Sequence, residues 1–295
     1  MHYKNIHVRD LAWALNSPSL MSFGSKKSPI WSNNSWSLQE YEKSKKLLTT
    51  CDNDPSELTE AVKPWPRFRL GKYYESLWSF WLKKNPRYEL LYENLQLHKN
   101  GITLGEFDFI LRDLKTKKTA HWEVSVKFYL GYGDTSLPSS WYGLQFNDRL
   151  DKKADHLNQQ QCQLSKSYEG KLFLSQKNIH VDEVRVILKG RLFYPSTTGN
   201  NQIPQNSNPQ HLKSEWKTFS DFITNHQQQP YQWVILNKSQ WFSNRDLNDP
   251  HYEFDDLKKL IADQIHSNPF CLAALNEGRE TFRLFVVPDG WHLPA

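Results

Sequence analysis

The sequence predicts an α/β protein whose core contains, in order, a helix, three strands, a helix and a strand of one mixed sheet. Hydrophobic patterns that alternate between helical and strand periods support this core between about Leu70 and Tyr194. The composition agrees, because 38% hydrophobic and 23% charged residues are typical of a chain that packs a core. A length of 295 residues allows one large domain, or a core with a smaller lobe.

The first core elements are a helix and a pair of strands. Large apolar residues recur at helical spacing from Leu70 to Leu82, and Asn85-Pro86 ends this helix. A strand is expected from Tyr88 to Leu97. Asn100-Gly101 then favours a tight hairpin turn, because both residues accept positive φ, and a second strand follows from near Leu104.

The second and third strands each have one apolar and one polar face. In the second strand, Glu106 and Asp108 alternate with apolar residues (Phe107, Phe109, Leu111). The polar run 113–118 turns the chain back into a third strand, 121–128. One face of that strand is expected to carry Trp122, Val124, Val126 and Phe128, and the other His121, Glu123, Ser125 and Lys127.

The core closes with a basic amphipathic helix from about Asp148 to Leu164 and a strand from Glu183 to Phe193. The last crossover should be right-handed. Three residues of this helix, Lys152, Lys153 and His156, would face phosphates if the protein binds nucleic acid. A solvated helix face is the simpler explanation of these residues.

Two flanking regions surround this core, which we place at residues 67–194. Residues 1–66 form an expected N-terminal helical or irregular layer, with helices at Val8–Leu15 and around Leu38–Leu48. Residues 195–210 are rich in Ser, Thr, Asn, Gln and Pro and are typical of a linker or long loop. Residues 211–295 form an expected α+β lobe, with helices at 216–225 and 255–265 and strands at 231–236, 271–275 and 281–287.

The charge, cysteine content and hydropathy narrow the class of protein. A net charge of +5 tolerates a polyanionic partner without requiring one. The three cysteines are far apart and lack metal-binding spacing, so they favour a reducing compartment. Because no apolar run is long enough to cross a bilayer and no signal sequence is evident, we expect a cytoplasmic protein without a membrane association.

Asp108 and Glu123 are the central candidates for chemistry. They are equidistant from the centre of the turn at 113–118, so a simple hairpin register places them opposite each other. Paired residues on one face have Cβ atoms about 5 Å apart. Two carboxylates this close require a proton or a cation between them, and Mg²⁺ prefers such oxygen ligands.

These residues and the order of elements resemble the PD-(D/E)XK (restriction-endonuclease-like) nuclease superfamily over about Leu70 to Tyr194. The stretches 105–109, 121–130 and 148–153 (GEFDF, HWEVSVKFYL and DRLDKK) more closely resemble a bacterial domain-of-unknown-function family numbered 1853. This closer resemblance spans most of the chain. The superfamily resemblance implies a metal-dependent nuclease that hydrolyses phosphodiester bonds of DNA or RNA with Mg²⁺ or Mn²⁺.

The resemblance also implies roles for individual residues. Asp108 and Glu123 become metal ligands, Glu75 a supporting acid or further ligand, and Lys127 the cation near the attacking water. The superfamily usually has its lysine two residues after the acid, where this chain has Ser125. Four residues of regular strand span about 13 Å, so in a regular strand Lys127 is too far from the carboxylates and another lysine, such as Lys152 or Lys153, would have to replace it. A β-bulge would turn Lys127 inward, and this is what we expect.

Simpler explanations remain open for each residue. Asp108 could be an exposed strand residue, Glu123 and Lys127 a same-face charge pair, and Glu75 part of an exposed helix flank. For the whole protein, the alternative functions are a catalytically inactive nuclease-fold protein that binds nucleic acid or acts as a scaffold, and an unrelated protein-interaction module.

Overall fold

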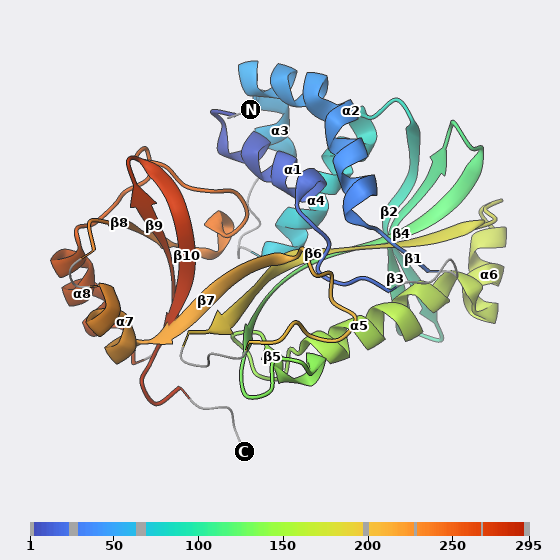
Figure 1. Ribbon diagram of the computed structural model, residues 1–295. Helices are drawn as coiled ribbons and strands as arrows, with labels where there is room; N and C mark the ends of the chain where they lie inside the picture. The colour runs from blue at the N-terminus through green and yellow to red at the C-terminus, as the bar shows by residue number, and fades with distance from the viewer. Residues whose placement is uncertain are drawn as a thin grey trace. The chain divides into compact units, whose positions relative to one another are not determined.

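The computed structural model describes residues 3–23, 29–62, 69–196, 201–226, 229–266 and 268–291 (Figure 1). Within these ranges the protein is mixed α/β, with eight α-helices and a ten-stranded mixed sheet. The helices are α1 (Ile6–Asn16), α2 (Asn34–Asn53), α3 (Ser56–Ala61), α4 (Leu70–Lys84), α5 (Leu150–Gln159), α6 (Tyr168–Ser175), α7 (Phe219–His226) and α8 (Phe254–Ala262). The strands are β1 (Ile30–Trp31), β2 (Tyr88–Lys99), β3 (Ile102–Asp113), β4 (Lys118–Gly131), β5 (Trp141–Tyr142), β6 (Glu183–Pro195), β7 (Leu212–Thr218), β8 (Gln232–Leu236), β9 (Phe270–Asn276) and β10 (Arg279–Val287).

The chain forms two compact units, and each is assembled from separate stretches of sequence. The first contains residues 1–127, 151–190 and 206–211, and the second contains residues 128–150, 191–205 and 212–295. Strands β4 and β6 each contribute residues to both units. The predicted end of the N-terminal layer at residue 66, and residues 197–200 of the predicted linker, lie outside the described residues.

The first unit is organised around the meander β2-β3-β4, followed by β6, with the short β1 parallel to β6. The β2-β3 turn has positive φ at Asn100 and Gly101, which confirms the predicted hairpin. Trp122 of β4 contacts Trp36 of α2 and Trp78 of α4, so these helices cover one face of the meander. On the opposite face lie α5, α6 and the short 3-10 helix η2 between them, residues Gln161–Lys166 (Figure 1).

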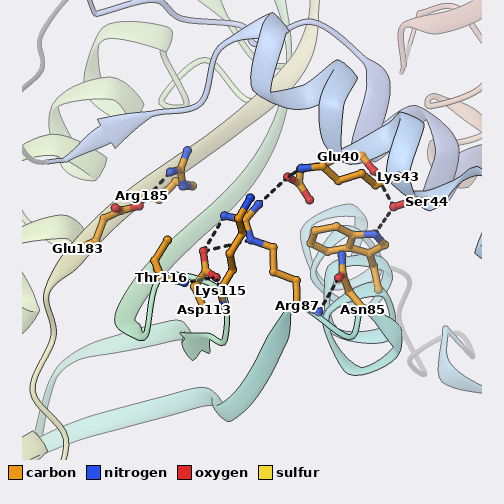
Figure 2. Close-up of polar contacts among 11 residues, drawn as sticks. Glu40, Lys43, Ser44, Asn85, Arg87, Asp113, Lys115, Thr116, Glu183 and Arg185 are labelled. Carbon is orange, nitrogen blue, oxygen red and sulfur yellow. Dashed lines mark hydrogen bonds and ion pairs between the residues drawn. The ribbon is translucent and has the colours of Figure 1, made fainter.

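A charged network fixes the turn between β3 and β4 (Figure 2). Arg87 Nη2 and Nε donate to Asp113 Oδ2 at 2.6 and 3.1 Å, and its Nη1 reaches Glu40 Oε1 at 3.1 Å. The other oxygen, Asp113 Oδ1, accepts from the backbone N–H groups of Lys115 and Thr116. Burial opposes the ionised form, yet hydrogen bonds from Arg87 and these amides lower the pKa of Asp113 to about 2. The turn is therefore anchored by an ionised carboxylate.

The second unit carries the C-terminal part of the sheet. In it β6, β7 and β10 are parallel neighbours, and β10, β9 and β8 pair antiparallel. An apolar cluster that includes Phe222 of α7 and Leu257 of α8 packs against Trp233 of β8. No helix in the described ranges is long and apolar enough to cross a membrane.

Two predicted helices differ from the structure. The helix expected at 216–225 begins only at Phe219, because residues 212–218 form β7 between β6 and β10, a non-local pairing without a sequence signal. The helix expected from 148 to 164 ends at Gln159, where the chain tightens into η2. Helix α6, whose N-terminus is capped by the Ser167 hydroxyl, was not predicted.

The network at the turn leads to a first prediction. Asp113→Asn removes the charge that Arg87 and two amides bind, so the free energy of unfolding at pH 7 should fall by about 1–3 kcal/mol. Urea denaturation measures it. Glu89→Gln is the matched control. It removes the ion pair between Glu89 of β2 and Arg112 of β3, which is 3.5 Å long and about half exposed, so the loss of stability should be under ~0.5 kcal/mol. Equal losses in the two variants would contradict the anchoring role of Asp113.

Candidate functional site

The registered pairs of β3 and β4 end just before Asp108 and Glu123. They run from Asp113 with Lys118 at the turn to Phe109 with Trp122. Asp108 and Glu123 are the next residues of the two strands. Beyond the last pair a side chain links the strands, because Asp108 Oδ2 accepts the Val124 N–H at 2.9 Å.

Asp108 is buried, with 8% of the residue exposed to solvent, and its environment disfavours the ionised carboxylate. Burial raises the pKa of Asp108 well above its ordinary value, and the nearby Glu123 and Glu75 raise it further, whereas the Val124 N–H opposes this shift. Asp108 therefore retains a proton far more readily than an aspartate in water.

The strand around Asp108 is irregular, which the sequence did not predict. Phe107 belongs to the same apolar cluster as Ile110, and its ring lies 5.0 Å from that of His121, so the expected alternation of Phe107 with Phe109 is wrong. On the neighbouring strand, Asn94 lies between the partners of these two phenylalanines and has φ of 50°. This distortion beside Asp108 changes the faces toward which its neighbours point.

Glu123 is completely buried, and both of its oxygens have protein partners. His121 Nε2 lies 2.7 Å from Oε1, and Gln161 Nε2 donates to Oε2 at 2.5 Å. Burial raises the pKa of Glu123 to about 8; Lys153 and hydrogen bonding with Asp108 oppose this shift, and Glu75 adds to it. Glu123 in turn raises the pKa of Asp108, so the two carboxyls lie near each other; that they converge on one point stays a prediction.

His121 supports Glu123 from the same strand face. Burial lowers the pKa of His121 to about 4, so its imidazole is neutral at physiological pH. Its Nδ1 lies 3.3 Å from Ser165 Oγ of η2, which leaves Nε2 to share a proton with Glu123. The proton on this pair fixes the orientation of Glu123.

Glu75 of α4 lies close to this pair but has its own cation. Lys72 Nζ lies 2.6 Å from Glu75 Oε2, 3.2 Å from Glu106 Oε1 and 2.9 Å from Asn94 Oδ1. Burial raises the pKa of Glu75, and Lys72 opposes that effect. Lys72 was not among the predicted site residues, although its position three residues before Glu75 on one helix is a recognisable signal.

Of the three basic residues predicted on α5, only Lys153 turns toward the carboxyls. It is half-buried, donates to Gln161 Oε1 at 3.1 Å and is the cation that most strongly affects the pKa of Glu123. Lys152 and His156 are exposed. Gln161 was missed because only the chain reversal after α5 brings it to Glu123.

Lys127 is half-buried on β4, which is one continuous strand from Lys118 to Gly131. Its Cα is therefore expected about 13 Å from that of Glu123. Its backbone lies against Gly190 of β6, where a Cβ would meet Lys127 O at 1.7 Å. The catalytic role predicted for Lys127 stays a prediction.

The charges at this site do not balance. Four carboxyls (Asp108, Glu123, Glu75 and Glu106) lie with two ammonium groups, Lys72 and Lys153. Two protons or one divalent cation would neutralise the excess. Within the described ranges no group of three or more His, Cys, Asp or Glu side chains is arranged to hold a metal, so Asp108 and Glu123 would bind one mainly with water.

Comparison with known proteins gives one match. The model of a family described as "Domain of unknown function (DUF1853)" matches residues 9–287. No curated protein and no solved structure matches the chain.

The raised pKa of Glu123 gives a prediction for stability against pH. Because the folded-state pKa is about 8 and the unfolded value about 4.3, the folded protein holds a proton that the unfolded chain releases. The contribution of Glu123 is therefore favourable at low pH and is lost as the pH rises to about 8. We expect Glu123→Gln to become progressively more stable, relative to the wild type, between pH 5 and pH 8 in urea denaturation with chelator present.

Glu93→Gln is the control for this measurement. Burial opposes the ionisation of Glu93, but hydrogen bonds from Lys83 and Ser79 lower its pKa. Glu93 therefore changes the pH dependence of stability only at acidic pH. It should leave the slope between pH 6 and pH 8 unchanged. If the free energies of unfolding of the wild type and of Glu123→Gln change with pH in parallel over this range, the raised pKa of Glu123 would be contradicted.

Proposed function

The chain belongs to the DUF1853 family, whose description names no activity, and from its acidic site we propose a metal-dependent nuclease that uses Mg²⁺ or Mn²⁺. We propose further that residues 67–194 have the PD-(D/E)XK nuclease fold. The order α4, β2, β3, β4, α5, β6 supports this proposal. Acidic residues on two adjacent central strands, Asp108 and Glu123, support it as well.

One observation carries the proposal: two carboxyls, Asp108 and Glu123, are buried in a group with more acids than cations. Buried acids of this kind destabilise a fold, and strongly perturbed carboxyls cluster at functional sites. Oxygen ligands suit Mg²⁺, which retains several waters and binds substrate phosphates. Asp108 and Glu123 fit that chemistry.

The residues around the pair have separable tasks. Asp108 and Glu123 would hold the cation, which supplies Lewis acidity and a water of lowered pKa. His121 and Gln161 orient the Glu123 carboxyl. Lys153, which lowers the pKa of Glu123, would stabilise negative charge near it.

Nucleic acid is the proposed substrate, and α5 is its proposed contact. Lys152 and His156 are exposed on the helix that carries Lys153. A phosphate backbone that follows this helix would meet their side chains on the way to the acidic pair. The net charge of +5 is compatible with this substrate.

A second candidate is the inactive nuclease-fold protein that binds nucleic acid or acts as a scaffold. One observation favours it: both Glu123 oxygens already have donors on His121 and Gln161, and a proton on Glu123 would satisfy the site without metal. The two candidates differ in whether a cation replaces that proton.

Cleavage assays distinguish them. We expect the protein to degrade DNA or RNA, single- or double-stranded, with Mg²⁺ or Mn²⁺ and not with chelator. Asp108→Asn and Glu123→Gln should each lower the rate by at least about 100-fold, because each removes a charge that holds the cation. Wild-type rates in either variant would refute the assignment, and an inactive wild type that still binds nucleic acid would support the second candidate.

Lysine variants form the controlled part of the same assay. Lys153→Gln should lower the rate by at least about 10-fold. Lys152→Gln removes the same charge from the adjacent exposed position of α5, so it should change substrate binding with little effect on the maximal rate. A maximal rate that depends on Lys127 and not on Lys153 would restore the original sequence-based assignment.

A further inference from the structure

The second unit contains a pocket of about 600 Å³ that the acidic site does not involve. Its volume lies within the range of small-molecule sites. Strands β6, β7 and β10, helix α7 and Asn201 of the segment between β6 and β7 contribute its lining residues.

The pocket has more cations than anions. Arg283 is neutralised by Glu280, whose oxygens it binds at 2.6 and 2.8 Å. Arg191 instead donates to neutral groups, Lys213 O at 3.2 Å and Ser214 Oγ at 2.9 Å, and its buried Nε has no hydrogen-bond partner among the described residues. Burial and, to a smaller extent, the charge of Arg283 lower the pKa of Arg191 to about 9. Its environment therefore disfavours the charged form, but Arg191 is still charged at neutral pH.

Lys213 adds a second cation to Arg191. It is exposed, and its Nζ lies 5.9 Å from the Tyr194 ring centroid. Glu215 is the one acid among the lining residues, and it is exposed with its carboxylate 3.8 Å from Lys217, which does not line the pocket. A group with negative charge would therefore be attracted to Arg191 and Lys213.

Planar rings form another part of the wall. His226 and Phe282 are stacked, with centroids 5.9 Å apart and planes at 29°, and both are half-buried. Both ring nitrogens of His226 are buried without a hydrogen-bond partner in the described part of the chain. Burial, followed by Lys217, lowers the pKa of His226 to about 4, so the ring is neutral and offers one donor and one acceptor.

Phe282 and Lys213 line the pocket from the neighbouring strands β10 and β7. Each lies two residues before the first registered pair of these strands, Leu284 with Glu215. The aromatic wall and the cationic wall are thus neighbours across two strands. A ligand that fits both must join a flat ring to an anionic group.

We propose that this pocket binds a nucleoside phosphate, with its base against Phe282 and His226 and its phosphate on Arg191 and Lys213. Bases stack on aromatic side chains, and guanidinium groups bind phosphate in two-pronged geometry. Ser214, Asn201 and Thr281 supply polar groups near the sugar and base edge. A free nucleotide and the phosphorylated end of a nucleic-acid strand share this chemistry.

Calorimetry with the full chain tests the proposal. The probes are AMP, GMP, ATP, a 5′-phosphorylated trinucleotide, adenosine and inorganic phosphate. We expect at least one of the four nucleotide probes to bind at least about 10-fold more tightly than adenosine or phosphate alone. Preference for the mononucleotides identifies the free ligand, and preference for the trinucleotide identifies the strand end.

Variants assign the binding to this pocket. Lys213→Gln, at an exposed position, and Phe282→Leu should each weaken binding at least about 10-fold. Lys259→Gln, which removes a lysine with a 79% exposed side chain on α8, should leave it unchanged. Glu123→Gln should also bind normally, which separates this proposal from the nuclease proposal.

Three results would overturn the inference. The first is the absence of binding for every nucleotide probe at millimolar concentration. The second is equal affinity for inorganic phosphate or adenosine and the nucleotides. The third is an affinity that Lys213→Gln and Phe282→Leu leave unchanged, or that Glu123→Gln abolishes.

Discussion

The ion pair between Arg87 and Asp113 holds the turn that sets the register of β3 against β4 (Figure 2). A slip of one residue would move every side chain of a strand to the other face of the sheet. In the observed register Trp122 faces the packed tryptophans of α2 and α4, and Asp108 and Glu123 directly follow the last registered pair. Apolar packing on one face and acidic chemistry on the other thus depend on the same turn.

The same register brings two acids into a place where neither is well solvated. The protein satisfies Glu123 with His121 and Gln161, and Asp108 with the Val124 amide, but it supplies fewer cations than acids. Such a site is stable when protonated and gains the most from a divalent ion when ionised. The pH dependence of stability and the proposed binding of metal therefore depend on the same two carboxyls.

Much of this arrangement could be predicted from sequence because it is local. Counting from the turn at 113–118 was enough to predict the register from Asp113 with Lys118 to Phe109 with Trp122, and the alternation of β4 placed His121 and Glu123 together. The DUF1853 resemblance was confirmed over residues 9–287. By contrast, β7 was taken for part of a helix, since its neighbours β6 and β10 are distant in sequence.

The remaining site residues depend on tertiary structure. Lys153 and Gln161 reach Glu123 only because α5 ends at Gln159 and η2 turns back across the sheet. Nothing in the sequence set Gln161 apart from its neighbouring glutamines. The pocket of the second unit lacked a sequence signal for the same reason, because its walls come from four separate elements.

The central claim is that Asp108 and Glu123 together hold one divalent cation, and anomalous scattering from a crystal grown with Mn²⁺ tests it most directly. The account predicts a single strong peak between the two carboxyls, with an oxygen of each at roughly 2.0–2.3 Å from the ion. It also predicts that one Glu123 oxygen exchanges its hydrogen bond with His121 or Gln161 for the metal. Absence of a peak there at millimolar Mn²⁺, with His121 and Gln161 still bonded to Glu123, would contradict it.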